Sequence, residues 1–78
     1  MILTCEINKK DESVEIVFDK EGYEYLGKVI RDFQKENDEK IDHKHLMTKG
    51  WGGNELTDEI MHKGNTLVNH LKLIFLKE

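Results

Sequence analysis

Two histidines separated by one residue, His43 and His45, are the side chains whose type and spacing point most directly to chemistry. Alternate side chains of a β-strand share one face, so these two imidazoles would start about 7 Å apart at the backbone and could converge on one metal ion. Imidazole nitrogen and carboxylate oxygen are common zinc ligands, so His70 or Glu55 could complete such a site. The alternative is that the histidines of this strand are exposed or hydrogen-bonded and bind no metal.

The only tryptophan, Trp51, lies between Gly50 and the pair Gly52-Gly53. In one interpretation the glycines supply a bend that folds the indole over the end of a sheet as a lid on the core. In the other the indole is an exposed anchor at a protein interface, where tryptophan is enriched. The glycines do not form a phosphate-binding loop, because no lysine follows at the required spacing. The sequence holds no complete catalytic motif, so its chemistry alone does not settle a function, and we expect no cofactor.

Composition predicts a single domain that spans residues 1–78, with 37% hydrophobic and 36% charged residues. No apolar run approaches the roughly 18 residues that cross a bilayer, and the N-terminus lacks the pattern of a signal peptide, so we expect a cytoplasmic protein without a membrane partner. The single cysteine, Cys5, cannot form an internal disulfide and is expected to be a buried strand residue.

The net charge of −4 is unevenly distributed. Residues 1–40 carry eleven acidic and seven basic side chains, and residues 41–78 carry five of each. Without a patch of lysine and arginine, the chain is a poor candidate for binding nucleic acid. The acidic first half either attracts a basic protein partner or is an ordinary solvated surface.

The first half of the chain predicts a hairpin followed by a helix. Met1–Asn8 and Ser13–Phe18 alternate apolar and polar residues, and the polar turn at 9–12 joins them. Asp19 is a good N-cap for a helix from Lys20 to about Glu36. Its apolar residues recur at helical spacing and are expected to form the core-facing stripe: Tyr23, Leu26, Val29, Ile30 and Phe33.

The second half predicts three further strands, at Ile41–Thr48, Glu55–Thr57 and Thr66–Leu76, with a turn at Gly64-Asn65. The last strand has an apolar face interrupted by Asn69, and we expect it to lie inside the sheet. The predicted fold is therefore α+β, a two-layer sandwich of order β-β-α-β-β-β, in which one helix packs on one face of a mostly antiparallel sheet.

Two segments resemble a known family. His43–Thr57 reads His-Lys-His-Leu-Met-Thr-x-x-Trp-Gly-Gly-x-Glu-Leu-Thr, and the segment from Gly64 to Phe75 begins Gly-Asn-Thr-Leu-Val-Asn-His-Leu. Together with Val14–Gly22, they resemble the immunity protein 32 family of bacterial polymorphic-toxin systems. The residues that match the family's motif are His43, His45, Trp51, Gly52, Gly53, Glu55 and His70.

This resemblance implies a small cytoplasmic protein that binds a cognate toxin domain and neutralises it without catalysis. The surface residues that we predict to contact such a partner are Trp51, Tyr25, Glu15, Glu21 and Glu24. Two alternatives remain at this stage. One is a metal-binding module or metal-dependent enzyme that uses His43, His45 and His70, and the other is a structural or regulatory subunit that works as a homodimer.

Overall fold

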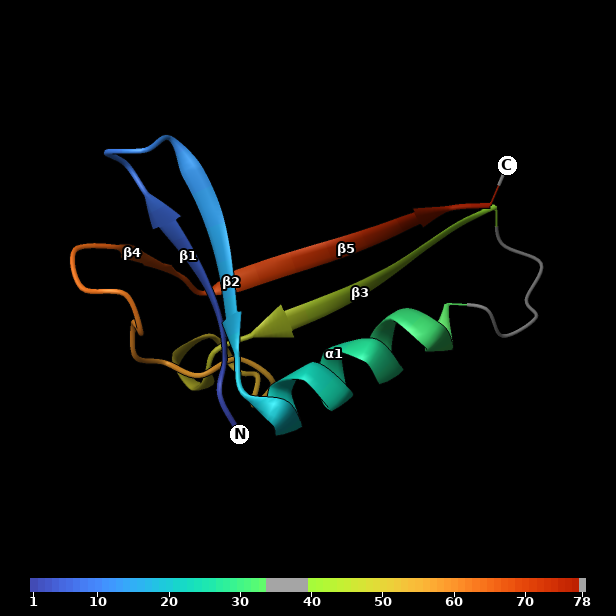
Figure 1. Cartoon of the computed structure of the whole chain (residues 1–78). Helices are drawn as coiled ribbons and strands as arrows, with labels where there is room; N and C mark the ends of the chain where they lie inside the picture. The colour runs from blue at the N-terminus through green and yellow to red at the C-terminus, as the bar shows by residue number, and fades with distance from the viewer. Residues whose placement is uncertain (34–39, 78) are drawn as a thin grey trace.

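The computed structural model describes residues 1–33 and 40–77 of the chain (Figure 1). It confirms the α+β class and the predicted order β-β-α-β-β-β. The elements are β1 (Leu3–Asn8), β2 (Ser13–Phe18), α1 (Lys20–Asp32), β3 (Ile41–Met47), the short 3₁₀ turn η1 (Lys49–Trp51), β4 (Thr66–Val68) and β5 (His70–Leu76).

The strands β1 and β2 form the predicted antiparallel hairpin. Leu3 lies opposite Phe18 and Cys5 opposite Ile16, so one face of this sheet is apolar along its length. Leu3 and Cys5 are buried, whereas the β2 residues opposite them are exposed. Burial raises the pKa of the Cys5 thiol, with a further contribution from the charge of Glu6, and this agrees with an inert strand cysteine.

Helix α1 begins where the sequence predicts. Asp19 caps it, because its Oδ1 accepts a hydrogen bond of 2.8 Å from the backbone N–H of Gly22. The core-facing stripe differs from the prediction, since Tyr23 is 65% exposed and Ile30 is exposed too. Tyr25, predicted as a surface residue, packs instead against the core. The helix ends at Asp32, and residues 34–36 of the predicted helix lie outside the described residues.

The last predicted strand is divided in two at Asn69, which is a correction to the single sheet expected from the sequence. β4 pairs with β1 and completes a sheet of order β2-β1-β4, whereas β5 pairs with β3 in a second sheet. Among the described residues, each half therefore has a strand neighbour on one side only, and neither lies inside a sheet. The predicted strand at Glu55–Thr57 reduces to one parallel bridge between Leu56 and Thr48.

The core lies where the two sheets and the helix meet. It contains one buried side chain from each of four segments, namely Leu3, Val29, Leu46 and Leu56. The partly buried Tyr25, Leu26, Leu71 and Leu73 pack around these four. No helix among the described residues has the length and apolar composition needed to cross a membrane.

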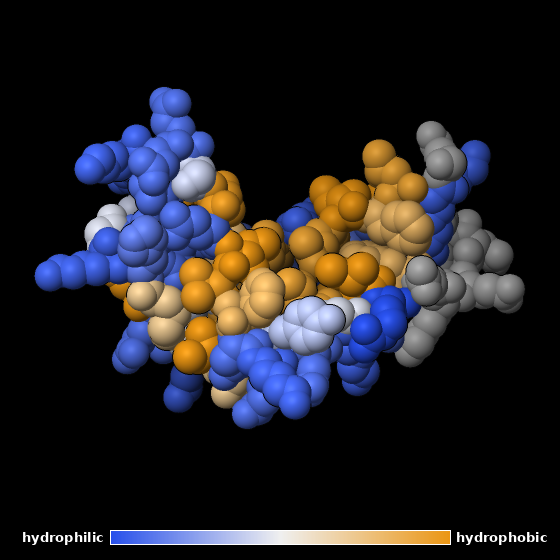
Figure 2. All heavy atoms as spheres, viewed as in Figure 1, coloured by the Kyte–Doolittle hydropathy of each residue, from blue (hydrophilic) through white to orange (hydrophobic). Residues whose placement is uncertain are grey.

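Beyond this core the two sheets diverge as two arms (Figure 1). The β1-β2 hairpin forms one arm, and the antiparallel pair β3-β5, with α1 beneath it, forms the other. Figure 2 shows a hollow between the arms, which we call the notch, with hydrophobic side chains gathered along both of its walls.

A first prediction concerns two glycines of α1. A side chain at Gly22 would overlap the carbonyl oxygen of Ile2, which cannot move freely because it also accepts a hydrogen bond from Asp19 N–H. A side chain at Gly27 would meet only the flexible end of Arg31, at 3.0 Å. We expect Gly22→Ala to lower the free energy of unfolding by about 2 kcal/mol, and Gly27→Ala to raise it by up to about 1 kcal/mol.

Urea unfolding followed by circular dichroism would test the pair. Equal effects of the two substitutions would contradict the close approach of Ile2 to the first turn of α1.

Candidate functional site

Four aromatic side chains lie in a row on the outer face of the β3-β5 sheet. The rings of His43 and His45 are 5.0 Å apart between centroids, and those of His45 and His70 are stacked at 5.0 Å. The Trp51 indole follows at 6.3 Å from His70. We call these four residues the ring cluster. They include four of the seven residues on which the sequence resemblance rests.

Strand pairing explains why the cluster forms. Met47 lies opposite His70 and His45 opposite Lys72, so the histidines of both strands project from the same face. Trp51 reaches the same place through η1, in which its backbone N–H donates to the Thr48 carbonyl. Gly52 closes this turn in a left-handed conformation with φ of 91°, which a glycine adopts without strain.

Within the cluster His45 and His70 are joined by a hydrogen bond. His45 Nδ1 lies 2.7 Å from His70 Nε2, so one ring donates a proton and the other must be neutral to accept it. Desolvation by the neighbouring side chains lowers the pKa of the exposed His45, and the nearby charges of His43, His70 and Lys72 lower it further. His45 is therefore kept neutral around pH 7.

A metal site is not assembled by these histidines. Among the described residues, no group of three or more histidine, cysteine, aspartate or glutamate side chains is arranged to hold a metal ion. Two imidazole nitrogens on one tetrahedral zinc ion would lie roughly 3.3 Å apart, from bond lengths of about 2.0 Å. The 2.7 Å between His45 and His70 is the distance of a direct hydrogen bond instead.

The position of Trp51 excludes its interpretation as a lid on the core, because its side chain is 60% exposed. The indole stands at the surface on a short turn held by three backbone hydrogen bonds, two to the Thr48 carbonyl and one to the Lys49 carbonyl. This is the geometry of an exposed aromatic group with little conformational freedom to lose on binding.

Tyr25 and Glu55 lie on the opposite side of β3 from most of the ring cluster. Both line a pocket of about 270 Å³ between α1 and β3, together with His45. Burial raises the pKa of Tyr25, and the charge of Glu55 adds to this shift. Tyr25 therefore stays protonated at neutral pH and offers a partner only its partly exposed edge.

The three predicted acidic contacts divide into two groups. Glu21 and Glu24 are exposed on α1. Glu15 is already engaged, because it accepts hydrogen bonds from Asn8, His62 and Asn65. The structure thus places the five predicted contact residues on β2, α1 and η1, so no one element carries them all.

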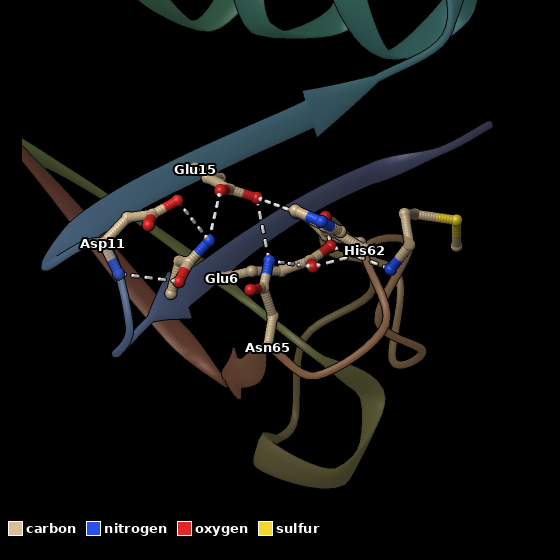
Figure 3. A network of polar contacts seen from close by, with 8 residues as sticks. Glu6, Asp11, Glu15, His62 and Asn65 are labelled. Atoms are coloured by element: carbon tan, nitrogen blue, oxygen red, sulfur yellow. Dashed lines mark hydrogen bonds and ion pairs between the residues drawn. The ribbon is translucent and has the colours of Figure 1, made fainter.

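The most extensive polar network centres on Glu6, which sequence reasoning did not single out (Figure 3). This carboxylate is fully buried in β1. It accepts hydrogen bonds from the backbone N–H groups of Met61 (2.9 Å) and His62 (3.2 Å), from the Asn65 amide (2.9 Å) and from the Thr4 hydroxyl. In the sequence, the only signal for Glu6 was its position on the face of β1 opposite to the apolar face.

The network fixes the irregular connection from Asp58 to Asn65 on the sheet. The Asn65 amide donates to both Glu6 and Glu15, and His62 Nδ1 lies 2.8 Å from Glu15. Burial alone would raise the pKa of Glu6, but the hydrogen bonds from Thr4, Met61, Asn65 and His62 outweigh it and hold that pKa at about 2. The carboxylate is therefore charged at neutral pH.

Comparison of the chain with protein-family models, with curated proteins and with solved structures found no match.

A second prediction follows from the Glu6 network. Glu6→Gln turns one acceptor oxygen into a donor that faces other donors, so we expect the free energy of unfolding to fall by roughly 3 kcal/mol. Glu59→Gln changes an exposed acid of the same connection and should have little effect. Because folding lowers the pKa of Glu6 from 4.5 to about 2, its contribution is present above pH 4.5 and is lost as the pH falls toward 2.

Chemical unfolding of both variants between pH 7 and low pH would measure these differences. A gap between native chain and Glu6→Gln that does not narrow in acid would contradict the role given to the charged carboxylate.

A third prediction separates two histidines by their titration. The hydrogen bond and charge of Glu15 raise the pKa of His62 above its ordinary value of 6.5, whereas that of His45 is lowered. In an NMR titration of the ring resonances, we expect His45 to titrate at lower pH than His62. Glu15→Gln should bring the His62 midpoint down and leave that of His45 in place, and coincident midpoints in the native chain would disprove this assignment.

Proposed function

We propose that this chain is a non-enzymatic binding protein that neutralises a cognate bacterial toxin domain in the cytoplasm of the cell that makes it. The proposal joins the sequence resemblance to the immunity protein 32 family with the observation that carries it in the structure, the exposed ring cluster. The cluster gathers residues from two of the three segments that bear the resemblance.

The cluster has the features of a binding anchor. Tryptophan is among the residues that contribute most to protein interfaces, and Trp51 is exposed while its backbone is held in a fixed turn. The histidine rings beside it extend the aromatic contact surface along β3 and β5. A partner that covers this row would bury aromatic area without first ordering a flexible loop.

Charge supports the same kind of partner. The chain carries a net charge of −4, and Glu21 and Glu24 are exposed on α1. A toxin with a basic surface, as nucleases have, would be attracted over a distance of about 10 Å at ordinary salt. These acids would mainly increase the rate of association, whereas Trp51 would slow dissociation.

The proposal yields a fourth prediction. The tagged chain, immobilised and exposed to lysate of its source cells in the presence of chelator, should retain a protein that carries a toxin domain. Co-expression of the native chain with that domain should restore growth. Trp51→Ala should weaken binding at least tenfold, which corresponds to about 1.4 kcal/mol, because it removes the anchor.

Ile60→Ala is the matched control, since Ile60 is also an exposed apolar residue but lies outside the ring cluster. Growth that is not restored by the native chain would overturn the proposed function. Retention only in the absence of chelator would favour the metal-binding alternative.

A further inference from the structure

A second exposed surface, separate from the ring cluster, is the hydrophobic wall of the notch. Figure 2 shows hydrophobic side chains on both arms, with the hollow between them. We call the exposed apolar side chains of these elements the apolar band. Its members are Val14, Ile16 and Phe18 of β2, Tyr23 and Ile30 of α1, and Ile74, Phe75 and Leu76 of β5.

The band spans both arms, and on β5 it occupies both faces: Phe75 lies on the face that packs on α1, whereas Ile74 and Leu76 lie on the same face as His43. Register places Val14, Ile16 and Phe18 on the face of the β1-β2 sheet that reaches the core through Leu3. The rings of Phe18 and Tyr23 approach to 6.2 Å, which links β2 to the helix. At the far end, Ile30, Phe33, Ile74 and Phe75 line an apolar pocket of about 280 Å³ between α1 and β5.

Strand β5 also presents an unpaired edge. Thr48 N–H donates to the Asn69 carbonyl, so His70 and the even-numbered residues after it direct their backbone groups away from β3. Among the described residues no strand pairs with that edge, and Figure 1 shows β5 on the notch side of β3. Lys72, Ile74 and Leu76 therefore offer N–H and C=O groups to an added strand.

The exposed area matches what a stable dimer would cover. A folded chain of 9.2 kDa is expected to expose about 4,900 Å², whereas this one exposes 5943 Å². The excess of roughly 1,000 Å² compares with the 800 Å² or so that each partner buries in a standard interface.

We propose that the notch binds a second copy of this chain, with the β5 strands of the two copies paired edge to edge. The geometry is self-complementary, because each copy supplies both an apolar arm and a notch. The seven residues of β5 extend about 23 Å and the six of β2 about 20 Å, so an arm of one copy matches the wall of the other in length.

A two-fold axis would make the contact reciprocal and closed. The eight side chains of the apolar band carry no charge, so the net −4 of each chain lies outside the contact. Pairing through β5 would convert two sheets of two strands into one sheet of four, of order β3-β5-β5-β3. A two-stranded sheet is marginally stable by itself, and this gain adds to the burial of the band.

The first test is the mass of the native chain in solution, and this is the fifth prediction. In sedimentation velocity from low micromolar to near-millimolar concentration, we expect a species of twice the 9.2 kDa chain mass. In hydrogen exchange followed by NMR, the amides of Lys72 and Ile74 should be protected in that species. A mass of one chain at every concentration, with rapid exchange of both amides, would overturn the proposal.

Two variants locate the contact. Ile16→Glu on β2 and Ile74→Glu on β5 place a charge in the band, at side chains that are exposed in one copy. Each should raise the dimer dissociation constant at least tenfold, with an unchanged circular dichroism spectrum. Ile60→Glu, at an exposed position outside the band, should leave the constant unchanged. A dimer that survives both band substitutions would place the interface elsewhere.

The dimer contact is separate from the proposed toxin-binding surface and goes beyond that function, because Trp51 is not part of the apolar band. A monomeric native chain that still restores growth would overturn the dimer alone. A dimer whose co-expression restores no growth would overturn the toxin-neutralising function alone.

Discussion

The two hydrogen bonds between Thr48 and Asn69 determine the shape of the molecule. Thr48 is buried, and its N–H donates to the Asn69 carbonyl at 3.0 Å while its hydroxyl donates to the Asn69 side-chain oxygen at 2.8 Å. They hold the end of β3 against the residue at which the last strand leaves β1. Before Asn69 the strand belongs to one sheet, and after it to the other. The notch, the open edge of β5 and the position of His70 beside Trp51 all depend on this change of partner.

A core built from four buried aliphatic side chains stabilises little by itself, and the buried carboxylate of Glu6 compensates for part of this. The connection between Leu56 and β4 forms no helix or strand among its described residues, yet two of its backbone N–H groups and the Asn65 amide bind Glu6. A buried charge is tolerated when it accepts this many hydrogen bonds, because they replace its hydration. The same bonds fix the start of β4, so the network supports the junction at Asn69 from the other side.

The sequence predicted elements whose signals are local and missed those that depend on distant contacts. Alternation identified β1 and β2, and Asp19 marked the start of α1, since both patterns act within a few residues. The helix face was rotated in the prediction, because Tyr23 and Tyr25 are both apolar enough for the stripe and the neighbouring strands decide which is buried. Asn69 was recognised as an interruption, but its role required Thr48 as a partner, 21 residues away. Glu6 gave only a weak signal, because all but one of its donors come from residues 61–65, far along the chain.

The ring cluster and the apolar band place different demands on the chain. An exposed tryptophan beside histidines is tolerated at the surface, since each ring keeps a polar edge in contact with water. A hydrophobic wall next to an unpaired strand is a different case, because the same features that bind one specific partner also promote open-ended association. Head-to-tail contacts would add copies without limit, whereas a two-fold contact uses both the arm and the notch of each copy at once and then stops. The proposed closed pair would cover the band and still leave Trp51 and the acids of α1 open to another protein.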